Sequence, residues 1–214
     1  MLDFSYLQDL LDSAIAAARV DRGGAIHVLV DSQQKLYLAA HTGFAPAFLS
    51  AFPPTDPVDR STAIGRAATT RQRVVIQDTE REEGYGPRDH ARSAGYRSAH
   101  AVPLISRKGK VLGVLILLYQ KPHYPSTFEL RTVDTYARMA ATVIEAGRLQ
   151  ASITSAERDG AHPSSAIELR AAIRRLRANP YNAVLVQEIC KLGDNYVDKM
   201  WAAVERIGAY AAGP

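Results

Sequence analysis

Polar and aromatic side chains in the segment 78–100 have the chemistry needed to hold a small ligand. Asp78 ends a strand-like run and could accept hydrogen bonds, and Arg97 could clamp an anion with two parallel donors. Tyr85 and Tyr96 could form a stacking wall that carries a polar tip. His100 could act as an axial ligand of haem. Residue types of this kind indicate binding rather than a reaction.

Each of these residues also has an ordinary structural explanation. We favour that explanation for any one of them taken alone, because a single sequence is weak evidence for a site. Asp78 could bond to a turn, and Arg97 could extend into solvent. The alanines beside His100 point to the opposite face of its strand, and a half-buried histidine with satisfied hydrogen bonds is the commoner outcome there.

The motifs that would indicate an enzyme are absent from the sequence. It has neither a phosphate-binding loop of the form G-x-x-x-x-G-K nor an H-E-x-x-H metal pair. Cys190 is the single cysteine, so neither an intrachain disulfide nor a cysteine-based zinc site can form within one chain. A packed helix residue is the favoured interpretation of Cys190. We therefore predict that the protein is not an enzyme and holds no metal.

The composition indicates a folded protein without a strong electrostatic field. The 214 residues are 47% hydrophobic and 22% charged, which predicts a packed core. The 26 basic and 22 acidic residues give a net charge of +4, too small an excess to indicate nucleic-acid binding. The N-terminus lacks the pattern of a secretory signal, and no apolar run approaches the roughly 20 residues that span a bilayer. We expect a cytoplasmic protein with no membrane partner.

Hydrophobic periodicity predicts the elements that must position these side chains. Strands are expected over 25–30, 35–41, 73–78, 98–106 and 111–120, and helices over 3–20, 61–72 and 126–152, with one short helix inside the loop 79–95. Strands joined by tight turns favour antiparallel pairing, and helices at both ends of the unit favour one helical layer on one face of the sheet. This order of elements predicts an α+β domain.

Four local features refine this prediction. Ser126 and Glu129 form a capping box at the start of the last helix of the domain. Pro103 lies in a strand and favours an edge, a bulge or an irregular start. The run 111–120 is apolar at almost every position, which is typical of a central strand covered on both faces. Within it, Gly113 would let another backbone or a ligand approach closely.

Several segments, taken in their order and spacing, resemble the GAF domain family over residues 1–152. They are KLYLAAHTG, STAIGRAATTRQRVVIQD, the GYRS turn at 95–98, AVPLIS, and the long run GKVLGVLILLYQKPHYPSTFELRTVDTYARMAATVIEAG. The resemblance implies a GAF-like antiparallel sheet with the terminal helices packed on one face and loops and short helices on the other. Proteins of this family sense small molecules or transmit signals, and many dimerise through their terminal helices.

The resemblance also implies where a ligand would bind, because pockets in GAF domains lie between the sheet and the loops that cover its open face. The corresponding region here runs from 53 to 98. The candidate ligand-binding residues in and beside it are Thr62, Asp78, Tyr85, His90, Tyr96, Arg97, Ser98 and His100.

Several ligands and activities of the family are disfavoured by the residues present. A covalent bilin needs a cysteine, and the free-methionine-sulfoxide reductases use cysteines of the domain itself, whereas Cys190 lies outside the resembling region. The signature of cyclic-nucleotide-binding GAF domains is not visible. Haem is left open through His100 but is not favoured, so the ligand stays unidentified.

The remaining residues are predicted to form a linker over 153–165 and a helical extension over 166–214, with two helices broken near Pro180. Arginines cluster on the first of these helices, at Arg170, Arg174, Arg175 and Arg177. Acidic residues farther along dilute this charge, so a solvated face is favoured over a DNA-reading helix. The apolar stripes within 166–210 favour a helical dimer or a surface that docks a partner protein.

These observations together predict a sensor or regulatory protein of the kind found in bacterial signal transduction. It would bind a small ligand or a protein partner and relay the signal through helices in a homodimer. The alternative is an interaction or scaffold module without a ligand, whose pocket is filled by its own side chains. An enzyme ranks last among these readings.

Overall fold

The computed structural model describes residues 5–45, 49, 53–158 and 171. The chain divides into two units, Phe4–Ile144 and a second unit that comprises Met1–Asp3 and Glu145–Pro214. The first unit holds the sheet and both cores, and it is the unit described below. The helical extension predicted over 166–214, with its break near Pro180, lies outside the described residues apart from residue 171.

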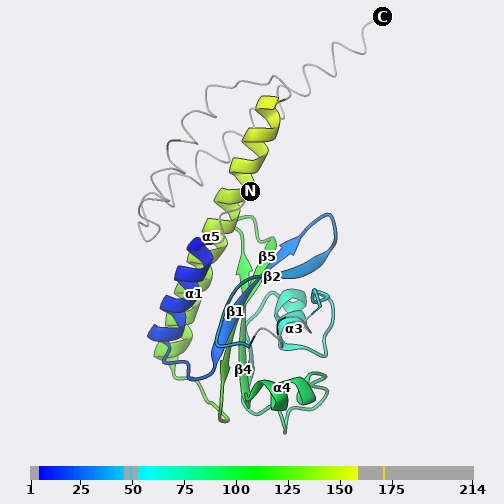
Figure 1. Ribbon diagram of the computed structural model, residues 1–214, viewed down its shortest axis with the longest axis vertical. Helices are drawn as coiled ribbons and strands as arrows, with labels where there is room; N and C mark the ends of the chain where they lie inside the picture. Colours follow the sequence, from blue (N-terminus) through cyan, green and yellow to red (C-terminus); the bar gives the residue numbers. More distant parts are fainter. Residues whose placement is uncertain (1–4, 46–48, 50–52, 159–170, 172–214) are drawn as a thin grey trace, which may run out of the picture. The chain divides into compact units, whose positions relative to one another are not determined.

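One antiparallel sheet forms the centre of the first unit (Figure 1). Its strands are β1 (Gly23–Val30), β2 (Lys35–Thr42), β3 (Val74–Ile76), β4 (Ser98–Ile105) and β5 (Val111–Tyr119). They lie in the order β2-β1-β5-β4-β3, and every neighbouring pair is antiparallel. The predicted α+β architecture with an antiparallel sheet is therefore confirmed.

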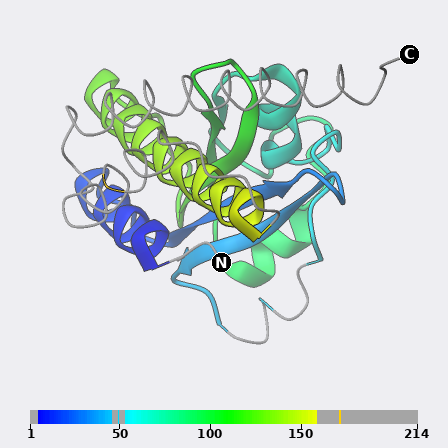
Figure 2. The same cartoon turned by 90° about the horizontal axis from the view of Figure 1, so that it is seen from above.

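The helices cover the two faces of this sheet differently. They are α1 (Ser5–Ala17), α3 (Ala63–Thr70), α4 (Arg88–Ala94) and α5 (Thr127–Arg158). Helix α1 and the first part of α5 share one apolar core with one face of the sheet, and Figure 2 shows these two helices side by side. The short helices α3 and α4 belong to a second core on the opposite face (Figure 1). This arrangement agrees with the predicted layers. No helix in the described residues is long and apolar enough to cross a membrane.

Strand β5 contributes side chains to both cores. Leu115 and Leu117 pack with α1 and α5, whereas Ile116 and Leu118 pack with α3 and α4. Successive residues of a strand point to opposite faces, so a central strand covered on both sides must be apolar at nearly every position. This is why the run 111–120 shows no alternation between apolar and polar residues.

Helix α5 begins as predicted and ends later than predicted. The Ser126 N–H donates to Glu129 Oε2 at 2.7 Å and the Glu129 N–H donates to Ser126 Oγ at 3.2 Å, which is the expected capping box. The helix continues to Arg158 instead of ending near residue 152. Residues 153–158 contain neither glycine nor proline, so nothing interrupts the helix in what was predicted to be the start of a linker.

The two irregular strand residues lie where their chemistry allows. Pro103 pairs with Val114 of β5, and it lies beyond Ala101, where β3 stops pairing with β4. The missing N–H of Pro103 therefore leaves no gap in a ladder between β4 and β3. Gly113 pairs with Val28, and a Cβ atom on Gly113 would overlap the carbonyl oxygen of His27. The glycine thus allows β1 and β5 to approach as closely as they do.

We expect Gly113→Ala to lower the free energy of unfolding by about 1–3 kcal/mol, because the added methyl group forces two backbones apart in the centre of the sheet. Urea denaturation followed by circular dichroism measures this change. Gly109→Asn is the control, because Gly109 lies in open space with a φ of 76°, which asparagine tolerates. Equal stability of Gly113→Ala and the unmodified protein would contradict this description of the sheet.

Candidate functional site

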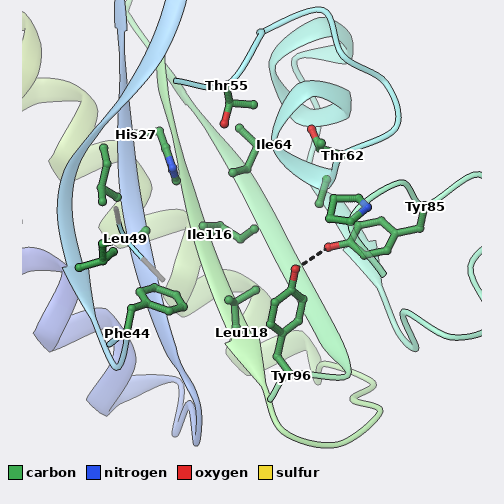
Figure 3. Close-up of a pocket in the computed structure, with 14 residues that line it drawn as sticks. His27, Phe44, Leu49, Thr55, Thr62, Ile64, Tyr85, Tyr96, Ile116 and Leu118 are labelled. Carbon is green, nitrogen blue, oxygen red and sulfur yellow. Dashed lines mark hydrogen bonds between the residues drawn. The ribbon is translucent and has the colours of Figure 1, made fainter. Parts of the chain in front are cut away.

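A cavity of about 60 Å³ lies between the sheet and the elements that cover its second face, the one with α3 and α4 (Figure 3). Its lining is almost entirely apolar. The lining residues are Ala25, His27, Leu38, Phe44, Leu49, Thr55, Thr62, Ala63, Ile64, Tyr85, Pro87, Tyr96, Ile116 and Leu118. The cavity therefore occupies the place in the fold where the resemblance located a ligand pocket.

The floor of the cavity is built by alternation along the central strands. His27 of β1 and Ile116 and Leu118 of β5 point to the cavity face, while their immediate neighbours in each strand point to α1 and α5. Leu38 pairs with His27 and adds an apolar side chain from β2. The floor is thus formed by the two inner strands β1 and β5 together with the edge strand β2.

Helix α3 forms one wall, and Thr62 fixes where that helix begins. Thr62 Oγ1 accepts a hydrogen bond from the Gly65 N–H at 2.9 Å, which caps the helix. A Cβ atom on Gly65 would overlap the carbonyl oxygen of Asp59, so the chain before the helix packs tightly on its first turn. Because α3 begins at Ala63, the side chains of Ala63 and Ile64 line the cavity.

Tyr85 and Tyr96 meet at the cavity with their hydroxyl groups 2.9 Å apart (Figure 3). Tyr85 lies in the loop before α4 and Tyr96 follows α4, and both side chains are buried. Their hydrogen bond joins the residues before and after α4 and places two hydroxyl groups in an otherwise apolar wall of the cavity. A ligand hydroxyl or carbonyl could exchange hydrogen bonds with this pair.

The lining of the cavity is uncharged at neutral pH. Burial lowers the pKa of His27 to about 4, so its imidazole is neutral at pH 7. Burial also raises the pKa of Tyr85 and of Tyr96, so both phenols keep their protons. Among the described lining residues there is no Asp, Glu, Lys or Arg, so a charged ligand would lose its hydration without gaining a counter-charge from them.

Asp78 and Arg97, two of the residues predicted to bind a ligand, bind each other. Arg97 Nη2 lies 2.8 Å from both carboxylate oxygens of Asp78, and Arg97 Nε lies 3.0 Å from Oδ1. Burial alone raises the pKa of Asp78, but hydrogen bonds from Arg97 and the Glu80 N–H outweigh it, and the net pKa is lowered. The pair joins the end of β3 to the start of β4 and does not line the cavity.

Three further candidates also lie away from the cavity. His90 is exposed on α4, and Ser98 Oγ donates to the carbonyl oxygen of Ile76 at 2.7 Å. His100 is buried among residues of the α1/α5 face, with its ring 4.8 Å from that of Tyr119. Burial is the largest cause that lowers the pKa of His100 to about 4. The structure therefore brings only Thr62, Tyr85 and Tyr96 of the eight candidates to the cavity.

The sequence reasoning missed His27, Phe44 and Leu49 among the lining residues. For His27 a signal existed, because it is the one polar residue in the apolar run AIHVLV. Alternation places it on the face opposite Ile26 and Val28. Phe44 and Leu49 follow β2 in a segment without periodicity, so no pattern in the sequence pointed to them.

The low pKa of His27 makes the free energy of unfolding depend on pH, and a substitution of His27 should remove this contribution. His27 titrates near pH 6.5 when unfolded and near pH 4 when folded, so only the unfolded chain gains a proton as the pH falls through this window. We expect His27 to account for a loss of about 2 kcal/mol in unfolding free energy between pH 7 and pH 5. His27→Gln should lose less stability over this interval than the unmodified protein, as measured by urea denaturation at both pH values.

His90→Gln serves as the matched control, because His90 is exposed on α4. Its stability should change with pH as that of the unmodified protein does. If His27→Gln shows the same loss as the His90→Gln control, then His27 is not buried in its neutral form and the description of the cavity floor is wrong.

Solved structures of similar fold come from several sources. The GAF domain of a phosphoenolpyruvate-protein phosphotransferase from Coxiella burnetii is 17% identical, with a TM-score of 0.61 over 70% of this chain and 86% of that chain. A GAF domain/HD domain protein from Geobacter sulfurreducens is 20% identical, with a TM-score of 0.57 over 69% and 95%. A free methionine-R-sulfoxide reductase from Neisseria meningitidis is 19% identical, with a TM-score of 0.54 over 68% and 81%.

At these identities the likeness shows the fold alone. A search of curated proteins by sequence found no match. The family model of the GAF domain, however, matches residues 6–145, which is more than half of the chain and contains the whole sheet and the cavity. The chain therefore belongs to the GAF domain family.

Proposed function

We propose that this protein is a non-catalytic GAF sensor whose cavity binds a small, uncharged and largely apolar molecule. The observation that carries the proposal is the cavity lined by apolar side chains, a neutral His27 and the Tyr85–Tyr96 hydroxyl pair. The apolar walls favour an apolar body, and the hydroxyl pair favours one polar group on the ligand. The lining residues that the structure describes include no cysteine and no carboxylate, which supports binding chemistry over catalysis by a carboxylate or a thiolate.

The size of the cavity links binding to a change of shape. An engineered apolar cavity of about 150 Å³ holds benzene, and this cavity measures about 60 Å³. A ligand the size of an aromatic ring therefore enters only if lining side chains move. Such movement is what a sensor needs, because a ligand shifts a conformational equilibrium only when the two states bind it differently.

Strand β5 supplies a route from the cavity to the helical layer. Ile116 and Leu118 line the cavity. Leu117, which lies between them, and Tyr119, which follows Leu118, pack in the core with α1 and α5. After Tyr119 only a short connection leads to the start of α5 at Thr127. A displacement of β5 by ligand would therefore reach the first turns of α5 directly.

The signal is proposed to pass on in a homodimer formed through the terminal helices. Tyr124, just before α5, and Phe128, in its first turn, support such an interface, because these large side chains are 68% and 71% exposed. Native mass spectrometry of the full chain should report the mass of two copies. A single-copy mass at micromolar concentration would remove the dimer from the proposal.

The small volume of the cavity favours a second candidate, an interaction module that transmits signals without a ligand. In that case the cavity is a packing defect of the core, and the helices dock a partner regardless of any small molecule. The two candidates differ in whether small neutral compounds bind the cavity saturably.

We expect benzyl alcohol, a neutral probe with one hydroxyl group, to bind the full chain saturably and to shift NMR signals of cavity residues such as Tyr85, Tyr96 and Ile116. Benzoate of the same size should bind at least tenfold more weakly, because its carboxylate would be desolvated without a cation. Ala63→Leu should abolish binding of benzyl alcohol by filling the cavity with extra methyl groups.

Ala16→Leu is the matched control, because it makes the same change at an exposed position of α1. This variant should bind benzyl alcohol as the unmodified protein does. Equal binding of benzoate, or unchanged binding in Ala63→Leu, would overturn the proposed ligand class and support the interaction module.

A further inference from the structure

A second hollow lies at the edge of the sheet, beside the short strand β3, and shares no lining residue with the cavity. It measures about 250 Å³. Its lining combines three arginines and one aspartate with an apolar base. The lining residues are Arg71, Arg73, Val102, Pro103, Ile105, Asp134, Ala137 and Arg138. All of them belong to the first unit, Phe4–Ile144.

The register of the sheet explains why this edge is open. Strand β3 begins at Val74 opposite Ala101, so β4 continues beyond its partner through Ile105. The chain before β3 leaves α3 through Arg71, which has a left-handed φ of 57° and donates its N–H to the Ala67 carbonyl oxygen at 3.0 Å. This cap holds the backbone of Arg71 at the rim of the hollow.

The arginines are only partly neutralised. Arg73 Nη2 pairs with Asp134 Oδ2, but its buried Nε has no hydrogen-bond partner among the described residues. Among the described residues, the guanidinium of Arg138 makes one hydrogen bond, from Nη2 to the Thr135 hydroxyl at 3.3 Å, and the guanidinium of Arg71 has no partner. The described lining thus carries three guanidinium groups and one carboxylate, which Arg73 binds, so its net charge is two positive charges.

We propose that this hollow is an anion site for a small molecule that carries a phosphate group on an apolar body. Guanidinium groups bind phosphate oxygens through several parallel donors, and two surplus charges match a phosphate dianion. Pro103 and Ile105 offer an apolar surface to the remainder of such a molecule. The site is separate from the cavity proposed to bind neutral ligands, so the chain would sense two classes of compound.

The hollow is suited to a small molecule because its charged residues converge on one concave place. Its volume of about 250 Å³ is many times the roughly 10–15 Å³ that a cavity needs on the same measure to hold one water molecule. The arginines come from two places far apart in the sequence: Arg71 and Arg73 lie in the connection between α3 and β3, and Arg138 lies on α5. Because Arg71 and Arg138 are exposed, binding is expected to weaken as salt is raised.

Phenyl phosphate is the probe, with inorganic phosphate and benzoate for comparison. NMR titration of the full chain should show saturable shifts of the Arg71, Arg73 and Arg138 signals with phenyl phosphate. Inorganic phosphate lacks the apolar body and benzoate lacks the second charge, so each should bind at least threefold more weakly. Arg71→Asn with Arg138→Ala should weaken phenyl phosphate binding at least tenfold, and asparagine tolerates the left-handed backbone at position 71.

The control variant Arg19→Asn with Arg131→Ala removes the same charges elsewhere. Arg19 also has a left-handed φ, of 51°, and Arg131 also lies exposed on α5, but neither lines the hollow. This variant should keep the affinity of the unmodified protein for phenyl phosphate. Equal weakening in both double variants, or no saturable shift of the three arginine signals, would overturn the proposal.

Discussion

The close pairing of β1 with β5 in the centre of the sheet is the constraint on which the rest of this structure depends. Gly113 lets the two backbones meet at His27, and the register set there decides which face every later side chain of β5 points to. A slip of one residue would move Ile116 and Leu118 to the α1/α5 face and Leu117 to the cavity. The register between β1 and β5 thus determines the lining of the cavity, the packing of the helical core and the route between them.

This constraint also separates two kinds of chemistry. The cavity lies above the middle of the sheet, where burial keeps His27 neutral and admits no uncompensated charge. The charged hollow lies at the edge, where β3 is short and arginine side chains reach solvent. The domain therefore has a neutral cavity at its centre and, at its edge, the hollow proposed to bind an anion. Helix α5 contributes residues both to this hollow and to the core that it forms with α1.

Most of the fold could be predicted from the sequence, because it is encoded locally. The unbroken apolar run of β5, the capping box at Ser126 and the tight turns each determine their element without distant contacts. The site could be predicted only in part. Tyr85 and Tyr96 lie at the cavity as predicted, but Asp78 and Arg97 form an ion pair with each other. That pairing depends on the geometry of the loop between them, which the sequence pattern does not reveal. The sequence places His100 in the correct strand, but the face of the sheet that it points to is determined by the pairing of β4 with β5.

The central claim is that a neutral apolar cavity lies between His27, the tyrosine pair and β5. Diffraction from crystals pressurised with xenon tests it most directly, because xenon occupies apolar cavities and needs no hydrogen bonds. We expect a xenon peak bounded by His27, Tyr96 and Ile116. Ordered water in that space, or no peak there while xenon binds elsewhere in the protein, would contradict it.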